Sequence, residues 1–167
     1  MSFSISLKCR PTSHSAGTSL EHQDASVEYE NLVMEACDVL ADTDCDFHVA
    51  GFGSSEWALD VSYDLSAFME QFPELLAGVR SRRYVEVDLY SQGVERVIQF
   101  HPEGDMVKIR CESRTNWTPD PDVEFTTQRN LDRMLSRLAV DFASALRDSG
   151  SPIARVAPFV DWQSGRV

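Results

Sequence analysis

Three aspartates within five residues, Asp42, Asp44 and Asp46, form the densest group of carboxylates in the chain. This spacing resembles the start of an EF-hand calcium loop, which also needs glycine at its sixth position and glutamate at its twelfth. Counted from Asp42, those positions hold Phe47 and Gly53, so the calcium motif is incomplete. Two interpretations remain: a solvated turn between a helix and a strand, or an acidic edge that binds a partner.

A second row of carboxylates recurs at every fourth residue, at Glu56, Asp60 and Asp64. Side chains at this spacing share one face of an extended strand. Two such carboxylates can divide acid and base roles when burial separates their pKa values. The sequence carries no sign of that burial, so a solvated polar face is the plainer interpretation and an active site is the alternative.

The residues between these two groups could cradle a phosphate or expose a nucleophile, because Gly51 and Gly53 precede Ser54 and Ser55. A dinucleotide fingerprint would need a third glycine where Glu56 stands. A nucleophile elbow would need a serine with glycine two residues away on each side. Both patterns are incomplete, and a hairpin turn is the prediction.

Two tryptophans stand among polar residues, Trp57 and Trp117. An aromatic side chain in a polar segment either plugs the core or anchors an interface. The core plug is the more common case, but Trp117 is kept as a candidate contact for a partner.

The cysteines have no C-x-x-C spacing, so a zinc site made from them and the histidines could be assembled only by the fold. The chain begins without the basic and apolar regions of a signal peptide. We therefore predict four free thiols in a reducing cytoplasm, with neither a metal site nor a cofactor. The residues concerned are Cys9, Cys37, Cys45, Cys111, His14, His22, His48 and His101.

Negative charge is concentrated in the first part of the chain. The 167 residues include 27 acidic and 15 basic side chains, a net charge of −12. Residues 1–64 hold twelve acidic and two basic side chains, whereas residues 65–167 hold fifteen and thirteen. Nucleic acids and anionic lipids both require clustered lysine and arginine, so this balance argues against either partner. A basic protein, steered to the acidic segment by charge, fits the asymmetry better.

Length and composition predict a single domain. About 100–200 residues is the usual size of one domain, and no apolar run approaches the roughly 20 residues of a membrane span. Hydrophobic residues make up 43% and charged residues 25% of the chain, as in ordinary globular proteins. We expect one α+β domain over residues 1–167, with a mobile loop near residues 11–26 and an apolar C-terminal tail over residues 149–167.

Alternating apolar residues predict a mostly antiparallel sheet. A strand is expected at residues 3–7, and a hairpin is expected from residues 47–51 and 57–63. The most regular alternation predicts a three-stranded meander of residues 85–89, 94–100 and 107–111, followed by a polar loop over residues 113–126.

Apolar residues at helical spacing predict helices packed on one face of that sheet. They cover residues 28–40, residues 65–79 and a last helix that ends near residue 146. Pro73 predicts a kink or a restart within the second helix, and Thr126 or Thr127 is expected to cap the last one.

In style, this acidic segment (residues 21–64), the meander and the closing helix (residues 131–146) resemble small acidic immunity proteins of bacterial toxin systems. The positions of Trp57, Gln92-Gly93 and Trp117-Thr-Pro119 are also similar to those of actinobacterial proteins of unknown function, a likeness that transfers no residue roles. The first resemblance implies a protein that neutralises a basic toxin, often a nuclease, by covering or neighbouring its active site.

Two functions of different classes follow. The first is an immunity-type inhibitor that docks a basic protein; the alternative is a small ligand-binding domain or enzyme with a site between the sheet and the helix of residues 65–80. A structural subunit held by its apolar tail is a weaker third possibility. No catalytic motif is complete, so an enzyme is not expected. The candidate contacts for a basic partner are Glu35, Asp38, Asp42, Asp44, Asp46, Glu56, Asp60 and Trp117.

Overall fold

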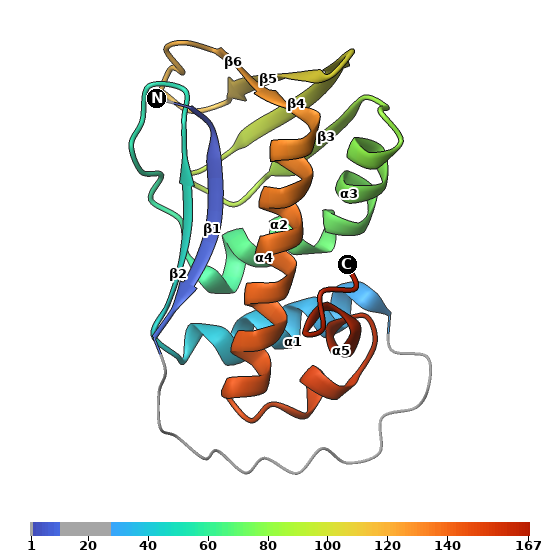
Figure 1. The fold of residues 1–167 in the computed structure, drawn as a ribbon. Coiled ribbons are helices and arrows are strands. Elements are labelled where there is room, and N and C mark those ends of the chain that lie inside the picture. The colour runs from blue at the N-terminus through green and yellow to red at the C-terminus, as the bar shows by residue number, and fades with distance from the viewer. Residues whose placement is uncertain (1, 11–27) are drawn as a thin grey trace.

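Two antiparallel sheets hold the strands of the computed structural model, which describes residues 2–10 and 28–167 (Figure 1). The loop predicted near residues 11–26 lies outside these residues. The smaller sheet pairs β1 (Ser4–Cys9) with β2 (Cys45–Ala50). The larger sheet has the order β3-β4-β5-β6. Its strands are β3 (Val85–Leu89), β4 (Arg96–Glu103), β5 (Met106–Ser113) and β6 (Val123–Thr127).

Helices pack against both sheets, so the predicted α+β class is confirmed. The longest, α4, packs on β1 of the small sheet and on β5 and β6 of the large one (Figure 1). The helical elements are α1 (Tyr29–Ala41), the π-helical turn η1 (Val61–Leu65), α2 (Ser66–Glu70), α3 (Phe72–Arg80), α4 (Gln128–Asp148), the 3-10 turn η2 (Pro152–Arg155) and α5 (Phe159–Trp162).

The large sheet has four strands, so the predicted strand count of three is wrong. The three predicted segments are adjacent and antiparallel, and their apolar residues face the core. The fourth strand, β6, lies in the segment predicted as a polar loop. Its inward positions are Glu124 and Thr126, so the alternation of apolar residues that marks a half-buried strand is missing there.

The predicted hairpin of residues 47–51 and 57–63 is also wrong. The hydrogen-bonded partner of β2 is β1, which lies about forty residues earlier in the chain. The backbone N–H of Trp57 does donate to the carbonyl of Val49 at 2.9 Å, but the chain then turns into η1. Asp60 caps this turn, since its Oδ1 accepts from the N–H of Tyr63 at 2.6 Å. A local helix cap therefore overrode a short alternating pattern.

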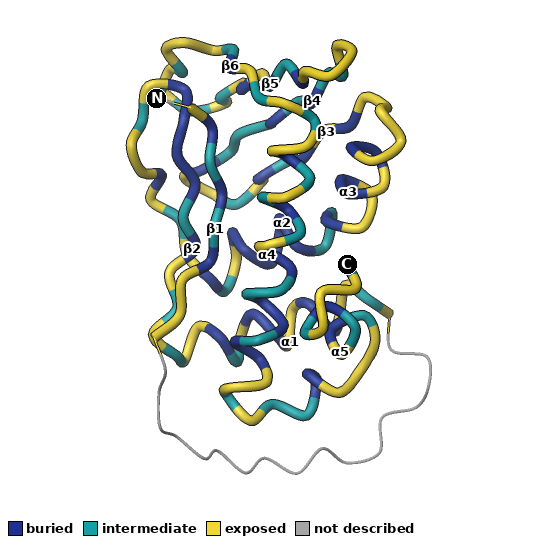
Figure 2. The backbone as a smooth tube through the Cα atoms, in the orientation of Figure 1, coloured by how far each residue is buried: buried dark blue, intermediate teal, exposed yellow. Residues whose placement is uncertain are grey.

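The helix predictions are confirmed. Pro73 lies in the first turn of α3, where its missing N–H costs nothing. Thr127 caps α4 by accepting a hydrogen bond from the N–H of Asn130 at 3.1 Å. The apolar tail packs on its own chain, because the ring of Phe159 lies 5.7 Å from that of Phe142. Buried positions run along the strands and α4, and the turns at their ends are exposed (Figure 2).

Cys9 and Cys45 form a disulfide, so the prediction of four free thiols is wrong. The two residues lie directly opposite each other in the register of β1 and β2, with Cα atoms 4.0 Å apart. The neighbouring N–H of Arg10 donates to the carbonyl of Asp44, which makes the cysteines a non-hydrogen-bonded pair. Side chains are closest at such pairs. A separation of 36 residues leaves no local signal of this pairing.

The other two cysteines, Cys37 and Cys111, are buried free thiols. Burial raises the pKa of each to about 12, so both are poor nucleophiles at neutral pH. Disulfides are typical of oxidising compartments, so the cysteines no longer support a cytoplasmic location, which stays a prediction. Within residues 2–10 and 28–167, no helix is long and apolar enough to span a bilayer.

Candidate functional site

An open hollow of about 700 Å³ lies where the end of α1, the start of β2 and the segment leading into η1 meet. We call it the acidic hollow, because three carboxylates line it, one from β2 and two from the segment leading into η1. Its acidic and larger apolar lining residues are Asp46, Glu56, Asp60, Phe47, Trp57 and Leu59. Three of the residues predicted to contact a partner are thus brought together at one place.

The three carboxylates of the acidic hollow are exposed, and Lys8 lies opposite Asp46 in the register of β1 and β2. Glu56 Oε1 lies 3.7 Å from Nδ1 of His48. Oδ1 of Asp60 accepts the backbone bond that caps η1. Within the described ranges, no lysine or arginine forms an ion pair with Asp46, Glu56 or Asp60. The hollow is therefore a place of concentrated negative charge.

The C-terminal end of α1 adds to this negative charge. Ala41, its last residue, lines the hollow. The final carbonyls of a helix carry a partial negative charge that favours cations, yet the last turn of α1 holds no basic residue. Instead Asp38 lies in that turn and Asp42 follows it, both exposed. The helix end and its acidic side chains both attract a positive group.

The remaining predicted residues lie beside the hollow rather than in it. Glu35 shares one exposed face of α1 with Asp38 and Asp42, at helical spacing. Asp44 forms an ion pair with Arg10, at 3.2 Å across the small sheet, and is thereby neutralised. The α1 acids therefore extend the acidic surface, whereas Asp44 contributes less to it.

Trp117 lies behind the hollow, packed against the buried Trp57 that forms part of its wall. The two ring centres are 5.7 Å apart. The guanidinium carbon of Arg96 lies 4.3 Å from the centre of the Trp57 ring and 3.8 Å from that of Trp117. Contacts of this kind hold a guanidinium by cation–π attraction. Trp117 therefore supports the wall of the hollow through Trp57.

Arg96 was not among the predicted site residues. It occupies the first inward position of β4, at the edge of the core. The inward positions that follow are Ile98 and Phe100, so a charged residue in this alternating row was a readable signal. Its Nε is buried without a hydrogen-bond partner among the described residues, and burial lowers the pKa of the guanidinium. The nearby carboxyl of Asp64 counteracts part of that shift.

Asp64 is the buried carboxyl beside the hollow, with only 3% of its surface exposed. Its Oδ2 accepts from the N–H of Asp60 at 2.8 Å. Burial raises the pKa of Asp64 above its ordinary value. The predicted row of Glu56, Asp60 and Asp64 is therefore divided, with two residues facing the hollow and one inside the protein.

Replacing Asp64 with asparagine is expected to change how stability depends on pH. Because the pKa of Asp64 is raised in the folded state, its contribution to stability is full below about pH 3.9, its ordinary unfolded value, and is lost as the pH rises through the folded pKa. Asp64→Asn keeps an oxygen for the N–H of Asp60 but cannot ionise. The variant should therefore gain stability relative to the wild type between about pH 4 and pH 7.

Urea unfolding of the wild type and of Asp64→Asn at about pH 4 and about pH 7 measures this difference in stability. All other titrating groups are common to the two proteins, so their effects cancel in the comparison. A difference in unfolding free energy that stays constant with pH would contradict the prediction.

The turn of residues 51–54 has a structural role. Gly51 and Ser54 exchange backbone hydrogen bonds of 2.9 and 3.0 Å, which confirms a tight turn. Gly53 has φ +82°, and a Cβ there would lie 2.1 Å from the carbonyl oxygen of Asp120. Glycine is thus needed because another backbone passes close by.

Glu124, also missed from the sequence, holds this turn against the large sheet. It is buried, and its Oε1 accepts from the N–H of Phe52 at 2.6 Å. Phe52 has φ +56°, an uncommon value for a residue with a side chain. No local signal marked Glu124, because the alternation that identifies a strand is missing from β6.

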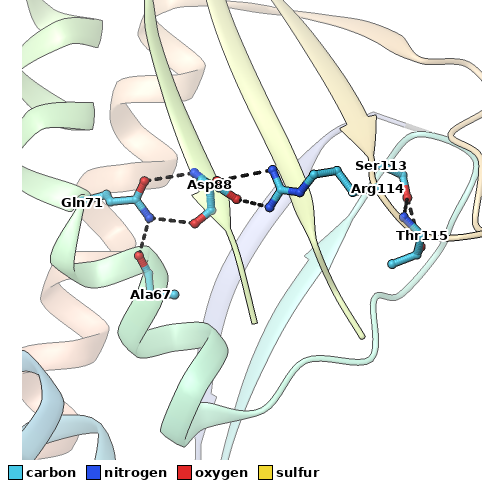
Figure 3. Close-up of polar contacts among 6 residues, drawn as sticks. All are labelled: Ala67, Gln71, Asp88, Ser113, Arg114 and Thr115. Atoms are coloured by element: carbon cyan, nitrogen blue, oxygen red, sulfur yellow. Dashed lines mark hydrogen bonds and ion pairs between the residues drawn. The ribbon is translucent and has the colours of Figure 1, made fainter. Parts of the chain in front are cut away.

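The alternative site, between the sheet and residues 65–80, is closely packed in the structure. A Cβ at Gly78 would lie 2.9 Å from Cβ of Val85. The side-chain amide of Gln71 donates to the carbonyl of Asp88 and accepts from its N–H, both at 2.9 Å (Figure 3). This packing favours the acidic hollow over the alternative as a place for a ligand.

Among the described residues, no group of three histidine, cysteine or acidic side chains is arranged to hold a metal ion. Comparisons with protein-family models, curated proteins and solved structures give no match for this chain.

Proposed function

We propose that this protein binds a basic protein, with lysine or arginine side chains of the partner entering the acidic hollow. The observation that carries the proposal is the meeting of Asp46, Glu56 and Asp60 around one open hollow, without a lysine or arginine ion pair among the described residues. Carboxylates form their strongest hydrogen bonds with cationic donors, and guanidinium groups can bind them in a bidentate manner.

The shape and lining of the hollow suit a basic side chain. Its volume of about 700 Å³ is large enough for the ends of one or more such side chains. The exposed Ala58 and the half-buried Leu59 provide contact for the methylene groups of lysine or arginine, while the charged end meets a carboxylate. A small metal ion fits less well, because no three ligands converge in the described residues.

The acidic surface along α1 favours fast association with such a partner. Exposed charges act mainly on the encounter rate, through steering over a distance set by salt. This distance is about 8 Å at physiological ionic strength, so the association rate should fall as salt rises. The acidic segment as a whole, with its twelve acidic side chains in residues 1–64, supports this reading.

The identity of the basic partner rests on the resemblance to immunity proteins of bacterial toxin systems. A bacterial toxin, and a nuclease above all, would present the required basic surface, and the protein would then act as its inhibitor. A cytoplasmic location belongs to the same proposal. Docking at the hollow itself does not depend on either point.

The test uses a defined cationic probe, an eight-residue peptide of alternating arginine and glycine, titrated into the full-length protein labelled with ¹⁵N. Amide shifts should concentrate at residues 45–47 and 56–62. Neutralising Asp46, Glu56 and Asp60 to their amides should weaken binding by about tenfold, since three exposed charges are worth roughly 0.5 kcal/mol each.

A matched control separates the hollow from net charge. Neutralising Glu74, Glu103 and Glu112 changes the charge of the protein by the same amount on α3 and the large sheet. This variant should bind the peptide within about twofold of the wild type. Equal weakening by both variants would reduce the proposal to attraction by overall charge and so overturn it.

A further inference from the structure

The two edges of the large sheet differ in whether their outward backbone groups have hydrogen-bond partners. At the β3 edge, the amide of Gln71 pairs with both backbone groups of Asp88 in the way a neighbouring strand would, and also donates to the carbonyl of Ala67 at 2.6 Å (Figure 3). The Asp88 carboxylate at this edge is bound in turn by Arg114, at 2.6 Å. A covered, charged edge of this kind resists pairing with other strands.

At the other edge, β6 leaves its outward backbone groups without a partner in the described chain. The N–H of Cys111 donates to the carbonyl of Asp122, so alternate residues of β6, beginning with Glu124, face β5. The backbone groups of Val123 and Phe125 therefore point away from the sheet. Phe125 is 53% exposed. Exposed apolar residues are uncommon on the edge strands of sheets, because such edges can pair with other chains.

We propose that two copies of this chain pair through β6, antiparallel, into one continuous sheet of eight strands. The two-fold axis would pass beside Phe125, so that this residue faces its own copy and Val123 faces Thr127 of the other chain. In this register, Phe125 of each copy exchanges two backbone hydrogen bonds with the other. The two exposed phenylalanine rings lie side by side and are removed from water.

Charge complementarity selects a second copy as the occupant of the edge. Asp122 immediately precedes β6, with its carboxylate 3.6 Å from Nε of Arg110, and the N-terminus of α4 follows the end of the strand. The first turn of α4 contains no acidic residue, and Arg129 in that turn is exposed. Antiparallel pairing brings Asp122 of each chain next to the α4 N-terminus of the other, where a carboxylate is stabilised. A parallel arrangement would place like charges together.

The pairing leaves the acidic hollow accessible. β6 lies at the opposite end of the molecule from α1, whose C-terminal residue lines the hollow (Figure 1). A dimer would thus present two acidic hollows.

The first test is the mass of the full-length protein by sedimentation equilibrium over a series of concentrations. The wild type should reach twice the mass of one chain. Phe125→Pro removes both the outward N–H and the exposed ring and should give a monomer; it should still fold, because proline is tolerated at strand edges. Glu86→Pro makes the same change at the covered β3 edge and should remain dimeric. The proposal is overturned if the wild type stays monomeric at all concentrations. Pairing of β6 with another protein in place of a second copy would overturn it as well.

Cysteine cross-linking tests the register and does not depend on the proline variants folding. Phe125→Cys should form a disulfide-linked dimer under mild oxidation, since residues facing each other in a sheet have Cα atoms about 5.5 Å apart. Val123→Cys is the matched control, because its own copy would lie roughly 14 Å away along the paired strands. Equal cross-linking of both variants would contradict the proposed axis.

Discussion

Reduction of the Cys9–Cys45 disulfide is expected to lower the free energy of unfolding by about 4 kcal/mol. The bond closes a loop between residues 36 apart in the sequence, and in the chain-entropy model its main effect is to restrict the unfolded chain. Urea unfolding with and without a reducing agent measures the loss. The double variant Cys9→Ala, Cys45→Ala should show a similar loss.

The same double variant is the control for side effects of the reducing agent. Its two remaining cysteines are buried free thiols, so a reductant should leave its stability unchanged. A thiol count gives an independent check: alkylation of the unfolded wild type should modify two cysteines before reduction and four afterwards. Four modified cysteines without reduction would show that the bond does not form, and would restore the original prediction of free thiols.

Phe142→Ala is expected to destabilise the protein by about 3–5 kcal/mol, the usual cost of removing a phenylalanine from a core. Phe142 lies on α4, has no exposed surface, and contacts the ring of Phe159 in α5. The substitution should therefore loosen the C-terminal tail as well as the core. Urea unfolding measures the loss, and protease sensitivity of the tail reports the local effect.

Tyr63→Ala is the corresponding surface control. Tyr63 is also an aromatic residue in a helical element, but 72% of its surface is exposed. Its removal should change the unfolding free energy by no more than about 0.5 kcal/mol. A loss below about 2 kcal/mol for Phe142→Ala would mean that the core at α4 is not packed as described.

Elements with a strong local pattern could be predicted from the sequence. The apolar stripe of α4 and its cap at Thr127 depend on residues within one helix, and so does the restart at Pro73. The pairing of β1 with β2 and the disulfide between them join distant residues, which no local pattern reveals. β6 escaped detection because its inward residue Glu124 is satisfied by Phe52, from another part of the chain.

The candidate site shows the same division. Acidic residues were identified by charge alone, but only the fold shows that Asp46 and Asp60 share a hollow while Asp64 is buried. Asp44 lies in the same cluster of aspartates, yet the register of β1 and β2 gives it Arg10 as a partner. Burial and ion pairing depend on tertiary contacts. Residue type therefore indicated that acidic side chains would make up the site, but it did not indicate which of them line the hollow.

The disulfide also changes the covalent topology of the chain. Residues 9–45 become a closed ring, and the remainder of the protein continues from it as a linear chain. A protease that cuts one peptide bond within this ring would open it without releasing either piece. Both parts would stay joined at Cys9 and Cys45, so that α1 would keep its covalent attachment to β1. In an oxidising environment this acidic part of the protein could thus be nicked and still remain one molecule.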